Sequence, residues 1–122
     1  MNRALRLVFL LPFLVVLLNA AGASGTWKGD FNFNGTTVPM TFNLTAAGEG
    51  LTGTVEGLPT SPTEVQDGKV DGDTISFWVI TEYQGDTYKL VYKGKVSDDR
   101  IQFTFGTEDG SFGAEVTAKK SS

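Results

Sequence analysis

The sequence contains no cysteine and no histidine. Without these side chains the chain cannot form a disulfide, a metal site of imidazole or thiolate ligands, or a Ser-His or Cys-His catalytic centre. Basic residues are also few, with 10 Lys and Arg against 14 Asp and Glu, and a negative net charge disfavours nucleic acid as a partner. We therefore expect a protein that is not an enzyme, has no catalytic residues, binds no cofactor or metal, and depends on its core for stability.

Adjacent carboxylates are the remaining candidates for acid–base or metal chemistry. Each pair falls in a predicted hairpin turn, where Asp is favoured because it bonds the local backbone. A weak calcium site is the alternative, although the spacing fits no EF-hand loop. The pairs are Asp71 with Asp73, Asp98 with Asp99, and Glu108 with Asp109.

The first 23 residues have the pattern of a secretory signal peptide. Arg3 and Arg6 precede an apolar run from Leu7 to Leu18, and Ala21-Gly22-Ala23 supplies a cleavage pattern of small residues. The run is too short for a bilayer, which needs about 20 apolar residues, so an uncleaved anchor is the less favoured alternative. The pattern predicts cleavage after residue 23 and a single mature domain, residues 24–122, secreted to the periplasm or the cell exterior.

Alternation of apolar and polar residues with a period of two runs through the mature part, broken by Gly, Asp and Asn pairs. It predicts an all-β domain in which successive hairpins form an eight-stranded antiparallel up-and-down meander that closes into a barrel and so removes its edges. An open sandwich is the alternative. The expected strands are Thr26–Phe33, Thr37–Thr45, Leu51–Glu56, Thr63–Asp71, Thr74–Tyr83, Thr87–Val96, Ile101–Thr107 and Ser111–Lys119.

Three two-residue turns set the predicted register, which decides the face that each side chain takes. Asn34-Gly35 places Phe31 opposite Val38. Asp109-Gly110 places Phe105 opposite Ala114, and Gly85-Asp86 places Tyr83 opposite Tyr88. In all three hairpins the inward sets match.

Gly25-Thr26-Trp27 at the start of the first strand, with Lys119 and Lys120 at the end of the last, resembles the signature of the lipocalin and avidin (calycin) barrels. The resemblance implies that the Trp plugs a closed end and that a basic side chain covers it. Leu51-Thr52-Gly53-Thr54-Val55 is similar to the third avidin strand, but Val55 and Gly57 stand where avidins place polar groups, so biotin binding is not implied.

The mature chain also resembles small secreted bacterial domains of unassigned function that begin G-T-W-x-G-x-F-x-F-x-G-x-x-V-P and continue L-T-G-T-V. Trp27, Phe31, Phe33 and the stretch from Leu51 to Val55 match this pattern. Such domains sometimes accompany carbohydrate-active ones, which implies an accessory role.

In a simple meander, alternate turns lie at opposite ends, so a Trp27 end is separated from an end that carries the Gly57–Thr63 loop. Polar and aromatic inward residues gather at that second end, as a binding site for a small apolar or amphipathic ligand requires. The alternative is that the tyrosines only pack there with their hydroxyls in water, around a filled lumen. The candidate ligand-binding residues are Phe33, Gln66, Thr81, Tyr83, Tyr88, Thr107 and Phe112.

An apolar patch is predicted on the outer face, and it supports a competing function. Its residues are Val65, Trp78, Ile80 and Val91, with Lys93 expected opposite Trp78. A contiguous exposed patch with an aromatic centre indicates an interface for a protein partner or a homodimer, or a platform for a carbohydrate. Local packing at the surface is the alternative.

Overall fold

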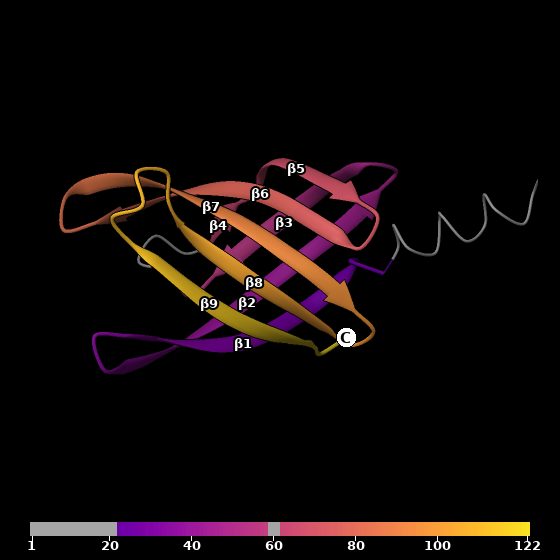
Figure 1. Cartoon of the computed structure of the whole chain (residues 1–122), viewed down its shortest axis with the longest axis horizontal. Coiled ribbons are helices and arrows are strands. Elements are labelled where there is room, and N and C mark those ends of the chain that lie inside the picture. The colour runs from indigo at the N-terminus through magenta and orange to yellow at the C-terminus, as the bar shows by residue number, and fades with distance from the viewer. Residues whose placement is uncertain (1–21, 59–61) are drawn as a thin grey trace, which may run out of the picture.

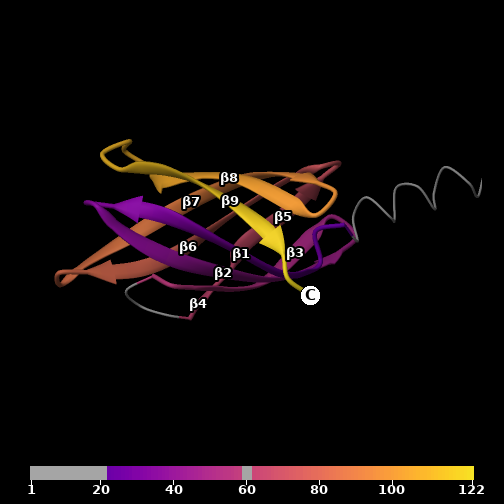
Figure 2. The same cartoon turned by 90° about the horizontal axis from the view of Figure 1, so that it is seen from below.

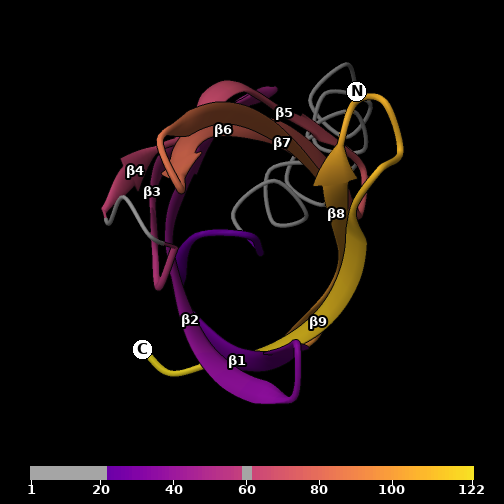
Figure 3. The ribbon, with the colours of Figure 1, turned by 90° about the vertical axis from the view of Figure 1, so that its left-hand side faces the viewer.

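The computed structural model describes residues 22–58 and 62–122, and these form an antiparallel barrel. Strands that are neighbours in sequence pair with each other, except that β4 and β5 both pair with β3, and β9 returns to pair with β1, which closes the ring seen in Figure 3. Because β4 and β5 occupy one position in the ring, the predicted eight-stranded up-and-down barrel is confirmed. The strands are β1 (Gly25–Phe33), β2 (Thr36–Ala47), β3 (Gly50–Glu56), β4 (Thr63–Glu64), β5 (Gln66–Asp71), β6 (Thr74–Tyr83), β7 (Asp86–Ser97), β8 (Arg100–Thr107) and β9 (Gly113–Lys120).

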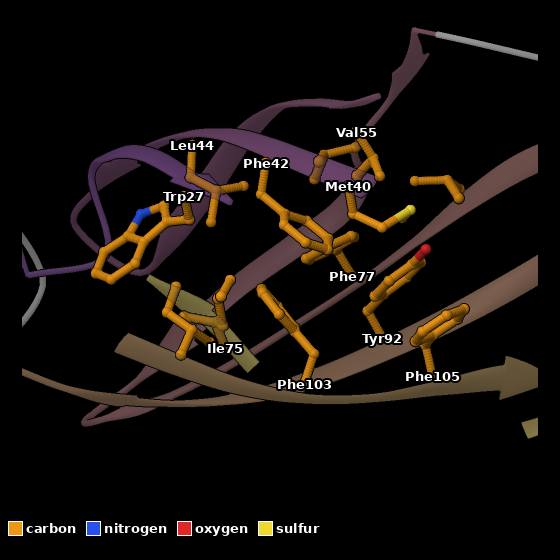
Figure 4. Packing of buried hydrophobic residues seen from close by; sticks show 14 of the residues in the cluster. Trp27, Met40, Phe42, Leu44, Val55, Ile75, Phe77, Tyr92, Phe103 and Phe105 are labelled. Atoms are coloured by element: carbon orange, nitrogen blue, oxygen red, sulfur yellow. The ribbon is translucent and has the colours of Figure 1, made fainter. Parts of the chain in front are cut away.

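Inward side chains fill the middle of the barrel with stacked aromatic rings (Figure 4). Tyr92 lies between Phe77 and Phe105, with ring centroids 4.8 and 4.6 Å away, and Phe42 stacks on Phe103 at 4.4 Å. Offset stacking of this kind stabilises aromatic pairs beyond the apolar area that they bury. The stack blocks the lumen halfway along, so any cavity must lie toward one end.

The registers of the β1–β2 and β8–β9 hairpins are confirmed, because Phe31 pairs with Val38 and Phe105 with Ala114. The register predicted for β6–β7 is wrong by two residues, since Tyr83 pairs with Asp86. The turn is Gln84-Gly85, with φ of 52° and 85°, so the glycine takes the second central position as it does in Asn34-Gly35. A slip of two leaves every side chain on its predicted face.

The expected strand Thr63–Asp71 is interrupted at Val65, which separates β4 from β5, and β5 contains a bulge. Gln66 pairs with Trp78 and Lys69 with Ser76, so one extra residue is inserted on this strand, and Asp67 there has φ of 49°. An inserted residue reverses the side-chain parity on one side of the bulge. Two predictions are therefore wrong. Val65, which was expected on the outer face, is buried in the core, and Gln66, which was expected to face inward, lies on the outer face beside Trp78.

The two ends of the barrel differ as the meander predicts. In Figures 1 and 2 the β1–β2, β6–β7 and β8–β9 hairpins reach one end, which we call the mouth, and the C-terminus lies at the other. At the far end Trp27 is fully buried, its indole N–H donates to the Ala23 carbonyl at 3.0 Å, and Lys120 Nζ lies 5.6 Å from its ring centroid. Across residues 22–58 and 62–122, no helix is long and apolar enough to cross a membrane.

The Ala23 contact predicts that the starting residue of the chain affects its stability. A chain that begins at Ser24 lacks the carbonyl that accepts the buried Trp27 N–H, whereas a chain that begins at Ala23 keeps it. We expect the shorter chain to unfold with a free energy lower by about 1–3 kcal/mol, the cost of a buried polar group left without its partner. Urea unfolding of the two chains measures the difference.

The same pair of chains carrying Trp27→Phe is the control, because the donor is then absent from both. If the difference stays as large in that background, the hydrogen bond is not its cause.

Candidate functional site

The mouth contains a cavity of about 480 Å³ that ends at the aromatic stack. This volume lies within the range of about 300–1,000 Å³ that small-molecule sites occupy. No residue that lines the described cavity carries a formal charge, and most of them are apolar. They are Phe31, Phe33, Val38, Gly57, Leu58, Thr81, Tyr83, Tyr88, Leu90, Phe105, Thr107, Ser111 and Phe112.

Three hairpins and the segment after β3 supply this lining. Six of the seven candidate residues from the sequence lie here, and Gln66 does not. The β6–β7 hairpin positions Thr81 opposite Tyr88, with Tyr83 two residues nearer the mouth. Of the predicted loop, Gly57 and Leu58 line the cavity, while residues 59–61, which include Pro59, lie outside the described residues.

Aromatic contacts connect the hairpins across the mouth. The Phe33 ring meets Tyr83 and Phe112 edge-on, with both centroids 5.8 Å away, and Phe31 meets Phe105 in the same way at 5.2 Å. Each of these pairs joins side chains from different hairpins. The side chain of Tyr83 remains partly exposed, so the wall of the cavity reaches solvent at this rim.

Sequence reasoning missed several apolar members of the lining. Phe31, Val38 and Phe105 were already assigned to the inward face by their parity, but they carry no polar group and had no feature that separated them from core residues. Leu58 lies beyond the end of β3, where alternation stops, yet it is buried at 7 % exposure. The sequence contains no periodic signal that would have found it.

Two buried hydroxyl groups lack a hydrogen-bond partner within the described residues: Thr81 Oγ1, which lines the cavity, and the hydroxyl of Tyr92. Thr81 is 4 % exposed and Tyr92 is fully buried. Burial raises the pKa of Tyr92 because it disfavours the phenolate, so its hydroxyl stays neutral. An unpaired buried hydroxyl costs free energy, which makes the Thr81 hydroxyl an available partner for a ligand.

The β8–β9 turn is ordered by the carboxylate of Asp109. It accepts hydrogen bonds from the Ser111 amide at 2.9 Å, the Ser111 hydroxyl at 2.7 Å and the Thr107 hydroxyl at 2.8 Å. The Phe112 amide in turn donates to Thr107 Oγ1 at 3.1 Å. This turn chemistry agrees with the interpretation preferred from the sequence, and it fixes the segment that places Phe112 against the cavity.

The outer patch is smaller than the sequence predicts. Ile80 and Val91 are 42 % and 39 % exposed around a half-buried Trp78, but Val65 is absent from it. The indole N–H donates to Asp67 at 2.9 Å, and Lys89 Nζ lies over the ring, 4.5 Å from its centroid. In the observed register Trp78 pairs with Val91, and not with Lys93 as the sequence predicted.

Comparisons of the chain with protein-family models, with curated proteins and with solved structures give no match. In the described ranges, no three acidic side chains gather closely enough to hold a metal ion. The cavity and the outer patch are the two candidate sites for function.

The Asp109 contacts predict a pH dependence of stability. Hydrogen bonds from the Ser111 amide, the Ser111 hydroxyl and Thr107 lower the pKa of Asp109 to about 2. A pKa below the unfolded value stabilises the fold above that value, and the contribution disappears as the pH falls through about 2. The free energy of unfolding of wild type should therefore exceed that of Asp109→Asn at pH 5, and the gap should close between pH 4 and pH 2.

Denaturant unfolding at a series of pH values measures this gap. Asp86→Asn, in the neighbouring hairpin at the mouth, is the matched control. If the difference in unfolding free energy between wild type and Asp109→Asn is constant across the pH range, the lowered pKa of Asp109 is contradicted.

Proposed function

We propose that this chain is an exported, non-enzymatic binding protein, in the periplasm or outside the cell, that holds a small apolar or amphipathic molecule in the cavity at the mouth. The observation that carries the proposal is the apolar cavity of about 480 Å³ left between the aromatic stack and the rim. A barrel of this size can fill its interior with side chains, and here it does so only in its middle and at the Trp27 end. The resemblance to calycin barrels is consistent with such a role.

The cavity also has the composition of a ligand site. Its walls are apolar, and its few polar groups are the hydroxyls of Thr81, Tyr83, Tyr88, Thr107 and Ser111. Sites for small molecules typically combine apolar walls with a small number of polar groups that orient the ligand. The uncharged lining favours binding through burial of apolar surface, which contributes roughly 25 cal/mol per Å².

An accessory role through the outer patch is the second candidate, supported by the exposed Ile80 and Val91. The ring of Trp78 is already in contact with Lys89 on one face, and its N–H is bonded to Asp67. With Val65 in the core, the patch offers less apolar area than the sequence predicts. Unchanged oligomeric state and glycan-array binding in Trp78→Ala would remove this candidate.

Fluorescence titration with diphenylhexatriene, an uncharged hydrocarbon probe, tests the proposed cavity. The wild-type protein should bind the probe, and Val38→Trp should weaken binding at least about tenfold because the larger ring occupies the cavity, a loss of about 1.4 kcal/mol. Val91→Trp makes the same substitution on the outer face and should leave probe binding unchanged.

Thermal unfolding of both variants checks that each is folded before binding is compared. Absence of probe binding to wild type, or equal binding by Val38→Trp, would refute the proposal. Native mass spectrometry of protein from its own host can then identify what occupies the cavity.

A further inference from the structure

Thr81 marks where a ligand in the proposed cavity would place a polar group. Its hydroxyl is in the wall, two residues deeper than Tyr83, and is almost fully buried without a partner among the described residues. A hydroxyl can donate one hydrogen bond and accept others. An uncharged hydroxyl, ether or carbonyl of a ligand would satisfy it, whereas an ionised group would lose its hydration in a lining that supplies no opposite charge.

The rim around the cavity is acidic. Four carboxylates lie in or next to the β6–β7 and β8–β9 turns at the mouth, and the nearby Lys89 lies 3.4 Å from one of them, Glu108. With Lys89 included, these groups carry a net charge of −3, half of the −6 for residues 24–122. Exposed charges of one sign around an opening repel ligands of that sign. The four are Glu82, Asp86, Glu108 and Asp109.

From these two observations we propose that the cavity selects ligands by charge: it takes an uncharged molecule with an elongated apolar body and one hydrogen-bonding group, which meets Thr81, and it discriminates against anionic amphiphiles such as fatty-acid carboxylates. This inference rests on the proposed binding function. The Thr81 hydroxyl accounts for the preference for a polar group, and the acidic rim accounts for the rejection of anions.

Displacement of diphenylhexatriene by two ligands of equal chain length, decanol and decanoate, tests the proposal at neutral pH. Decanol should compete at least about tenfold more tightly than decanoate. Thr81→Val removes the hydroxyl and nearly keeps the shape, so it should weaken decanol by about 3- to 10-fold, the worth of one hydrogen bond. Thr81→Ser keeps the hydroxyl and should compete like wild type.

The hydrocarbon probe distinguishes a failure of the binding function from a failure of the selectivity, because it has no group to which Thr81 could form a hydrogen bond. The probe should bind Thr81→Val at least as tightly as wild type, because the substitution removes an unpaired hydroxyl from the wall. If the probe does not bind wild type, the binding function itself fails. If it binds but decanol is insensitive to Thr81→Val, or decanoate competes as well as decanol, only the proposed selectivity fails.

Removing negative charges from the rim tests whether the rim causes the rejection of anionic ligands. Asp86→Asn with Glu108→Gln should raise decanoate affinity and leave decanol affinity unchanged, because both side chains are exposed in the hairpins at the mouth. Asp71→Asn with Asp98→Asn removes the same charge at the opposite end of the barrel and is the matched control. The preference for decanol should also narrow in 1 M salt, where the screening length falls to about 3 Å. A preference unchanged by both the rim variant and salt would overturn the role of the rim.

Discussion

The stack of Tyr92 between Phe77 and Phe105 is the packing on which the rest of the structure depends. An eight-stranded barrel has an interior that side chains can just fill, and these rings come from three neighbouring strands, β6, β7 and β8. Phe42 from β2 contacts Tyr92 and stacks on Phe103, so the rings also join opposite sides of the barrel in a chain that has no cysteine. They also form the boundary between a filled half and a hollow half, so that stability and the cavity have the same structural origin.

Alternation in the sequence was enough to assign most side chains to a face, and six of seven candidate cavity residues followed from it. The predicted register of the β6–β7 hairpin was wrong by two residues. An error of two leaves every side chain on its predicted face, so the cavity residues of this hairpin were still identified. The bulge at Asp67 defeated the same reasoning, since an inserted residue has no mark in a two-residue pattern. Gln66 and Val65 therefore exchanged sides, which removed one residue from the predicted site and one from the outer patch.

The boundary of the domain was also only partly visible in the sequence. Small residues at Ala21-Gly22-Ala23 fit a cleavage site, but the structure uses Ala23 as part of the core, with its side chain buried and its carbonyl bonded to Trp27. Cleavage after residue 23 would remove this carbonyl and this buried side chain, so the predicted cleavage site and the packing at this end require different first residues. The Ser24 hydroxyl likewise accepts from the Ala46 amide at 2.9 Å, so the segment before β1 contributes to closing this end.

The mouth combines two kinds of interaction that act on different parts of it. Polar turn contacts such as those of Asp109 fix the backbone of the hairpins in water, while rings such as Phe33 and Phe112 connect the hairpins through apolar contact. A ligand seated among these rings would add contacts to several hairpins at once, and binding to the folded state alone stabilises that state in proportion to the logarithm of ligand concentration. Because the stack beneath is already packed, this stabilisation would be concentrated in the hairpins, which makes occupancy of the cavity and order at the mouth thermodynamically coupled.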